Sequence, residues 1–93
     1  EVSPMARVLA QFRVLLDPNT DPEKVSSEIA AAVEPLGVQF MDKKSAPVAF
    51  GIMALTVLLS TPEEEGITEK IVDALSSIPG VSSVELEAMS RSG

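Results

Sequence analysis

Hydrophobic residues recur at every second position in several parts of this chain, a period that is typical of β-strands. The predicted strands span residues 5–16, 38–44, 52–59 and 81–89. Because residues 52–59 are almost wholly apolar, they are expected to form a central strand of the sheet. In the last strand Val84, Leu86 and Ala88 are expected to point inward, and residues 90–93 are expected to follow as a polar tail.

Two other segments repeat with the period of an amphipathic α-helix. The first is expected to begin after Asp21, an N-cap residue followed by Pro22, and to end at Gly37. The second is expected to start with Thr68 as its N-cap, and a start at Thr61 is the alternative. Each helix carries one apolar stripe, so one side of each is expected to cover the sheet.

The resulting order of strands and helices, β-α-β-β-α-β, predicts an α+β fold of the ferredoxin-like type. In this fold a four-stranded antiparallel sheet carries two helices on one face. The other face must then meet solvent or a partner. The residues expected on or near that face are Leu9, Leu15, Met53, Leu55, Val57 and Met89. An exposed sheet seldom carries so much apolar surface, so an interface or weak self-association is expected there.

Length and residue usage restrict the classes of function. The 93 residues leave room for a single domain over residues 1–93, whose ends, 1–4 and 90–93, are expected to be flexible. The sequence has no cysteine and no histidine, which removes thiolate chemistry, cysteine-ligated metals and the usual general base. Neither an enzymatic activity nor a cofactor is therefore expected.

The net charge of −7 bears on the partner and the location. Such acidity repels phosphate backbones, which argues against nucleic-acid binding and favours a partner with basic patches. No apolar run approaches the ~20 residues that a membrane helix needs. Since no signal-peptide pattern is present either, a cytoplasmic protein without membrane contact is expected.

One aromatic side chain stands apart from the predicted core. Phe50 lies between Pro47 and Gly51 in the run Pro-Val-Ala-Phe-Gly-Ile, directly before the strand 52–59. Pro and Gly shape the backbone at this point, and a core strand needs no aromatic residue on its entry turn. Phe50 therefore either caps the core or contacts a partner.

The run 47–52, the apolar strand, the acidic loop and a Gly-x-Thr helix start together resemble a known family. They are similar to the guanine-nucleotide exchange domain of translation elongation factor 1-beta, most of all in its single-domain archaeal form. The resemblance implies a protein that promotes GDP release from the GTPase elongation factor 1-alpha. In that family the aromatic of the Pro-x-x-aromatic-Gly motif lies at the surface that meets the elongation factor. The resemblance thus assigns partner contact to Pro47, Phe50 and Gly51.

A second match lies near the end of the chain. The run Glu87-Ala88-Met89-Ser90-Arg91 resembles, with two changes, the Ala-Ala-Met-x-Lys-like end of eukaryotic members of the family. Their terminal Lys is pushed toward the magnesium and phosphate region of the GTPase, which assigns Met89 and Arg91 to the partner surface. Because Arg is a planar fork and Lys a compact charge, Arg91 is expected to disturb carboxylate or phosphate contacts rather than to mimic the cation. A frayed, solvated tail is the alternative.

Strand direction predicts where these two groups lie. The third and fourth strands both adjoin the first in antiparallel sense, so they are expected to run parallel to each other. Phe50 and Arg91 would then lie at opposite ends of the sheet.

Other features favour simpler interpretations. The run 63–65, three glutamates, is expected to be a solvated loop rather than a cation site. The pair Lys43-Lys44 is expected to reach solvent at the end of an edge strand and to oppose strand pairing. The main rival function is a ferredoxin-like module that senses a small metabolite or dimerises. An RNA-recognition domain and an acylphosphatase-like enzyme share the strand order, but the sequence lacks their stacking aromatics and phosphate-binding loop.

Overall fold

The structure is a computed structural model that describes residues 7–49 and 51–92, with the backbone alone at 91 and 92. The elements, in chain order, are β1 (Arg7–Leu16), α1 (Pro22–Val33), the 3₁₀ helix η1 (Glu34–Leu36), β2 (Gln39–Ala49), β3 (Ile52–Pro62), α2 (Ile67–Ser76) and β4 (Val81–Ser92). The predicted order of strands and helices is confirmed. Residues 1–4 and 93, assigned to flexible ends by the sequence, lie outside the described residues.

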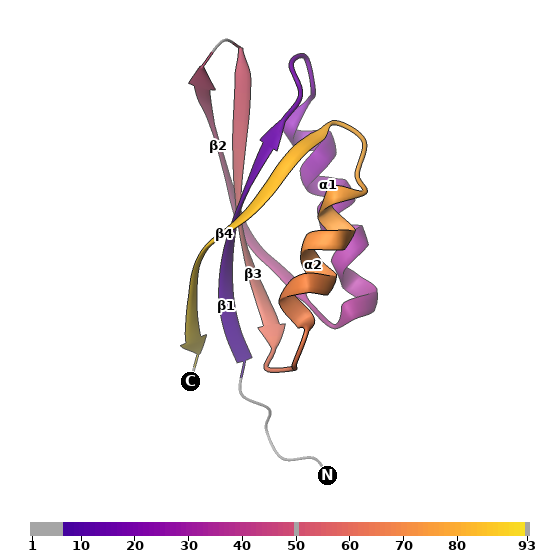
Figure 1. Cartoon of the computed structure of the whole chain (residues 1–93), viewed down its shortest axis with the longest axis vertical. Helices are drawn as coiled ribbons and strands as arrows, with labels where there is room; N and C mark the ends of the chain where they lie inside the picture. Colours follow the sequence, from indigo (N-terminus) through magenta and orange to yellow (C-terminus); the bar gives the residue numbers. More distant parts are fainter. Residues whose placement is uncertain (1–6, 50, 93) are drawn as a thin grey trace.

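The four strands form one antiparallel sheet in the order β2-β3-β1-β4, and both helices lie on one side of it (Figure 1). This arrangement confirms the ferredoxin-like α+β fold. Both β3 and β4 run antiparallel to β1, so they run parallel to each other, as predicted. The start of β3 and the end of β4 therefore lie at opposite ends of the sheet (Figure 1).

The core lies between the sheet and the helices. Every even-numbered residue of β1 from Val8 to Leu16 is buried, as the period of two predicts. Among them Phe12 has no exposed surface and pairs with Val57 on β3 and Leu86 on β4. The buried apolar residues that the helices contribute are Val25, Ile29, Val33, Ile67, Ile71 and Leu75. Phe12 thus packs at the point where both halves of the sheet meet the helices.

The faces of β3 are the reverse of those expected. Leu55 and Val57 are buried under the helices, because they pair with the inward-facing Val14 and Phe12 of β1. Met53 packs against the same core. In residues 52–59 only Thr56 is polar, so the sequence marks the inward face of this strand weakly. The open face instead carries Leu9, Leu15, Ala54 and Leu58. Self-association through this face stays a prediction.

The first helix begins where the sequence predicts. The Oδ1 atom of Asp21 accepts a hydrogen bond from the backbone N–H of Glu23 at 3.0 Å. The α-helical part ends before Pro35, which has no N–H to continue the ladder. The chain then tightens into η1, and Gly37, at φ +77°, donates its N–H to the Glu34 carbonyl at 3.0 Å. The predicted stop at Gly37 is confirmed.

The second helix begins earlier than predicted. Its N-cap is Gly66, at φ +81°, and no side chain caps it; Thr68 lies within the first turn. The backbone N–H of Lys70 donates to the Gly66 carbonyl at 3.1 Å. Thr61, the alternative start, belongs to β3. A glycine with positive φ thus ends the acidic loop and opens α2.

Three of the strands are longer than predicted, and among them β3 reaches Pro62 instead of Leu59. The second, β2, continues past Lys44 to Ala49, and all residues from 41 to 49 are exposed. Because no inward-facing side chain recurs there, the hydrophobic pattern does not mark this part as a strand. The last strand, β4, continues past Met89 to Ser92 and pairs there with the start of β1.

A register shift in β4 exchanges the faces of its last residues. Leu86 pairs with Phe12 of β1. The next paired residue of β4 is Ala88, so Glu87 is the extra residue of a β-bulge. Beyond the bulge Met89 lies on the helix side of the sheet and Ala88 on the open face. This placement is the reverse of what strict alternation predicts.

Candidate functional site

The residues that the sequence singles out lie at two ends of the sheet. Pro47 is in β2 and Gly51 follows it in the β2–β3 hairpin, whereas Met89 and Arg91 are in the last part of β4. Phe50 lies outside the described residues.

The strand register sets the separation between these ends. Thr61 of β3 and Arg91 of β4 both pair with Val8 of β1, so they lie at the same level of the sheet. The part of β3 from Ile52 to Thr61 spans about 30 Å at about 3.3 Å per residue. The two groups of predicted residues are therefore not brought together, as strand direction predicts.

The hairpin end is formed by two strands and a tight turn. Pro47 pairs with Met53, and Ala49 pairs with Ile52. Gly51 adopts φ +77°, a backbone conformation that residues other than glycine rarely adopt. A Cβ atom added there would meet nothing within 4 Å. Pro47 is tolerated because β2 is an edge strand. The hairpin extends away from the helices (Figure 1), so its surface is open to a partner.

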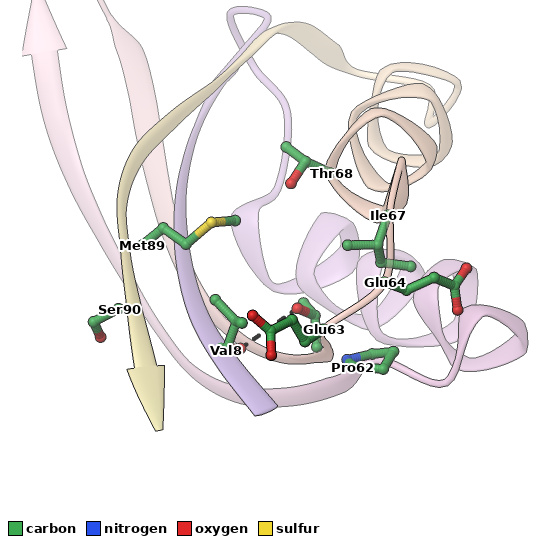
Figure 2. Close-up of a pocket in the computed structure, with 9 residues that line it drawn as sticks. Val8, Pro62, Glu63, Glu64, Ile67, Thr68, Met89 and Ser90 are labelled. Atoms are coloured by element: carbon green, nitrogen blue, oxygen red, sulfur yellow. Dashed lines mark hydrogen bonds between the residues drawn. The ribbon is translucent and has the colours of Figure 1, made fainter. Parts of the chain in front are cut away.

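The opposite end of the sheet contains an open pocket of about 310 Å³. It lies between the end of β4, the start of β1, the turn after β3 and the start of α2 (Figure 2). Its lining combines apolar, hydroxyl-bearing and acidic side chains, among them Val8, Ile67, Met89, Thr68, Ser90 and Glu63.

The pocket depends on the bulge in β4. Met89 reaches from β4 toward Thr68 at the start of α2, and Glu63 lies between Val8 and Ile67 (Figure 2). Without the extra residue in β4, strict alternation would turn Met89 to the open face and remove one wall. Among the predicted partner-contact residues whose side chains the structure describes, Met89 is the one that lines this pocket.

Arg7 connects three elements at this end of the sheet. Its Nε donates to Ser60 Oγ at 2.9 Å, and its Nη2 donates to the carbonyl oxygens of Ser60 at 2.8 Å and Gly37 at 3.3 Å. Its backbone pairs with Ser92 of β4. Arg7 thereby steadies the part of β1 against which the end of β4 pairs. A basic residue at the start of a strand gave no sequence signal of this role.

The two lysines of β2 lie within the strand and not at its end. Lys43 Nζ lies 2.7 Å from Glu23 Oε1 and 3.2 Å from Ser26 Oγ, both on α1. Lys43 is exposed, as predicted, but it also joins the edge strand to a helix, which the sequence did not predict.

The acidic loop after β3 is exposed, and Glu64 pairs with Lys70 at 3.3 Å. Within residues 7–49 and 51–92, no three acidic side chains gather closely enough to hold a metal ion. In the same part of the chain neither helix has the length and apolarity needed to cross a bilayer.

Comparison with known proteins identifies the family. A family model described as the EF-1 guanine nucleotide exchange domain matches residues 12–91, a range that includes the β2–β3 hairpin and β4 as far as Arg91. The chain belongs to this family. The predicted resemblance to this family is thereby confirmed.

Archaeal relatives match nearly all of this exchange domain. Elongation factor 1-beta of Korarchaeum cryptofilum is 42% identical over 89 residues, which cover 96% of this chain and 97% of the relative. Elongation factor 1-beta of Methanocella arvoryzae is 38% identical over 88 residues, with coverages of 94% and 98%. The exchange domain is thus similar in length to these relatives.

Two solved structures share the fold at low identity. The C-terminal domain of the MgtC protein from Mycobacterium tuberculosis has a TM-score of 0.68 at 23% identity, covering 95% of this chain and 92% of that one. The ACT domain from GTP pyrophosphokinase of Chlorobium tepidum has a TM-score of 0.60 at 15% identity, with coverages of 85% and 96%. At such identities the similarity concerns the fold alone.

Proposed function

We propose that this exchange domain promotes GDP release from the GTPase elongation factor 1-alpha. One observation carries the proposal: the family match covers residues 12–91 and so contains the hairpin and the end of β4 as far as Arg91. Exchange requires no covalent chemistry. The domain has to bind the GTPase better without nucleotide than with it, because linkage then lowers the affinity for nucleotide by the same factor.

The two ends of the sheet take different parts in this proposal. The hairpin, with Pro47, Phe50 and Gly51, docks on the GTPase, and the aromatic ring holds its deformed loops in place. Arg91, beside Met89 at the end of β4, acts on the magnesium and phosphate site. Magnesium demands nearly ideal octahedral coordination, so a guanidinium that competes for its carboxylate or phosphate ligands loosens the bound nucleotide.

The geometry requires a partner of a certain size. The two surfaces are separated by about 30 Å of sheet, which is about the diameter of a small domain. One GTPase that contacts both must therefore extend along the whole sheet. This requirement is compatible with a partner larger than a single small domain.

The release of a fluorescent GDP from elongation factor 1-alpha tests the proposal. The rate of release is expected to rise with the concentration of added exchange domain until the complex is saturated. Release at the spontaneous rate, despite folded protein in excess, would reject the proposal. Concentration-dependent self-association without any effect on the GTPase would favour the small-module alternative.

A further inference from the structure

We infer that the pocket at the end of β4 receives a basic side chain, Lys or Arg, of the partner GTPase when the two proteins dock. The identity of the partner rests on the proposed function. The inference itself rests on the lining of the pocket, on its charge and on its position next to the end of β4.

The pocket combines an apolar floor with a carboxylate. Val8 and Ile67, 9% and 6% exposed, form the floor, and Met89, 47% exposed, forms a wall. Glu63 is exposed and lies among them (Figure 2). Lys and Arg bury their methylene stems along apolar surface while the charged head stays near water or an acid. An apolar floor with an acid above it therefore suits this class of side chain.

Two described cations near the pocket, Lys70 and Arg7, are already engaged within the protein. No basic side chain is among the described residues that line the pocket. Lys70 pairs with Glu64 at 3.3 Å, and Arg7 donates to Ser60 and Gly37. The net charge of the chain is −7, which favours a cation over an anion as the external group.

The acceptors at the pocket allow a further hydrogen bond. Glu63 has a contact of its own within the protein, but a carboxylate offers about four lone-pair sites and accepts several donors at once. The hydroxyl group of Thr68 adds an acceptor in the lining. A Lys or Arg head group, which carries several N–H donors, can therefore be satisfied here.

Position and size favour a side chain of the GTPase over a free metabolite. Met89 and Ser90 line the pocket and directly precede Arg91, which the proposed function places at the phosphate site of the GTPase. Protein surfaces that bind phosphate carry Lys and Arg, so docking brings such residues close to this pocket. The pocket volume of about 310 Å³ is at the lower limit for small-molecule sites.

Two matched pairs of variants test the inference. Glu63→Gln removes the charge of the pocket, and Glu65→Gln makes the same change in the same loop outside the lining. Met89→Ser removes the apolar wall, and Leu86→Ser replaces another exposed apolar residue of β4 outside the lining. The affinity of each variant for elongation factor 1-alpha is measured by calorimetric titration, and thermal unfolding verifies that each variant is folded.

The pocket variants are each expected to bind about fivefold more weakly, whereas both controls stay within about twofold of the original protein. The defect of Glu63→Gln is expected to shrink as salt is added, because exposed charge pairs are screened. The rate of GDP release at saturation is expected to stay unchanged in Glu63→Gln, since the change affects docking alone. Equal losses within a pair, or no loss in the pocket variants, would overturn the inference.

The same measurements separate this inference from the proposed function. If the original protein binds the GTPase without accelerating GDP release, the proposed function fails, and the comparison of affinities still decides the role of the pocket. If release is accelerated but the members of each pair bind alike, the inference alone fails.

Discussion

The two ends of the sheet differ in what supports them. At the hairpin end, β2 and β3 stay paired past Ala54, where the pairing of β3 with β1 ends, and residues 41–49 are all exposed. At the other end, β4 pairs with β1 next to the start of α2 and encloses a pocket with it. A two-stranded ribbon is only marginally stable by itself. Under the proposed function, the less supported hairpin provides docking and the better supported strand end acts on the nucleotide site.

The largest effect is expected at the residue that supports both ends. Phe12 is fully buried and pairs with β3 on one side and with β4 on the other. Phe12→Ala is expected to lower the free energy of unfolding by about 3–5 kcal/mol, because it leaves a cavity in the core. Denaturant unfolding measures the loss, with Met41→Ala at an exposed position as the control. A loss below about 1 kcal/mol would show that the two ends are stabilised separately.

The next effect concerns the hairpin. Phe50→Ala is expected to weaken binding to elongation factor 1-alpha by about 2 kcal/mol or more, because buried aromatic residues anchor interfaces. Val48→Ala changes an exposed residue of the same hairpin and is expected to have little effect. Affinities from titration of the GTPase provide the comparison. An unchanged affinity in folded Phe50→Ala protein would exclude the hairpin aromatic as the anchor.

The end of β4 is expected to influence the rate of release more than docking. Removal of Arg91 to Gly93 is expected to slow the catalysed release of GDP about tenfold, which corresponds to about 1.4 kcal/mol lost in the transition state. Removal of residues 92 and 93 alone keeps Arg91 and serves as the control. Release rates at saturating exchange domain measure the effect. Full activity after the longer truncation would mean that the displacing group lies elsewhere.

The smallest effect is expected at Arg7, which steadies the part of β1 that pairs with the end of β4. Arg7→Lys keeps the charge but loses the fork that bonds Ser60 twice, so a loss of about 1 kcal/mol in stability is expected. Backbone amides near Met89 are expected to exchange hydrogen faster. Arg13→Lys, on the same strand and face, is the control. Equal exchange rates in the two variants would contradict a supporting role for Arg7.

The sequence predicted those parts of the fold in which side chains meet a core. The even residues of β1 and the cap at Asp21 are where periodicity and residue type require them, because burial and capping act on single side chains. The hydrophobic periodicity did not predict β2 beyond Lys44, because an exposed part of an edge strand needs no apolar alternation.

The candidate site was predicted less completely than the fold. Residue type and the family resemblance indicated Met89, but strict alternation turned it toward the open face. The bulge at Glu87 is a backbone feature, and no residue in β4 marks it in advance. The pocket also depends on Ile67 and Thr68, which join it only because a glycine opens α2. Such a cavity forms from the relative placement of elements, which local patterns do not encode.

Because of the bulge at Glu87, the faces of the last residues of β4 depend on the number of residues in the strand as well as on their types. A point substitution alters one side chain and leaves its neighbours facing as before. Loss of a single residue ahead of Met89 would instead turn every later side chain to the opposite face of the sheet, since successive strand residues point in opposite directions. In this strand, one deleted codon can remodel a whole contact area that no individual replacement would reach.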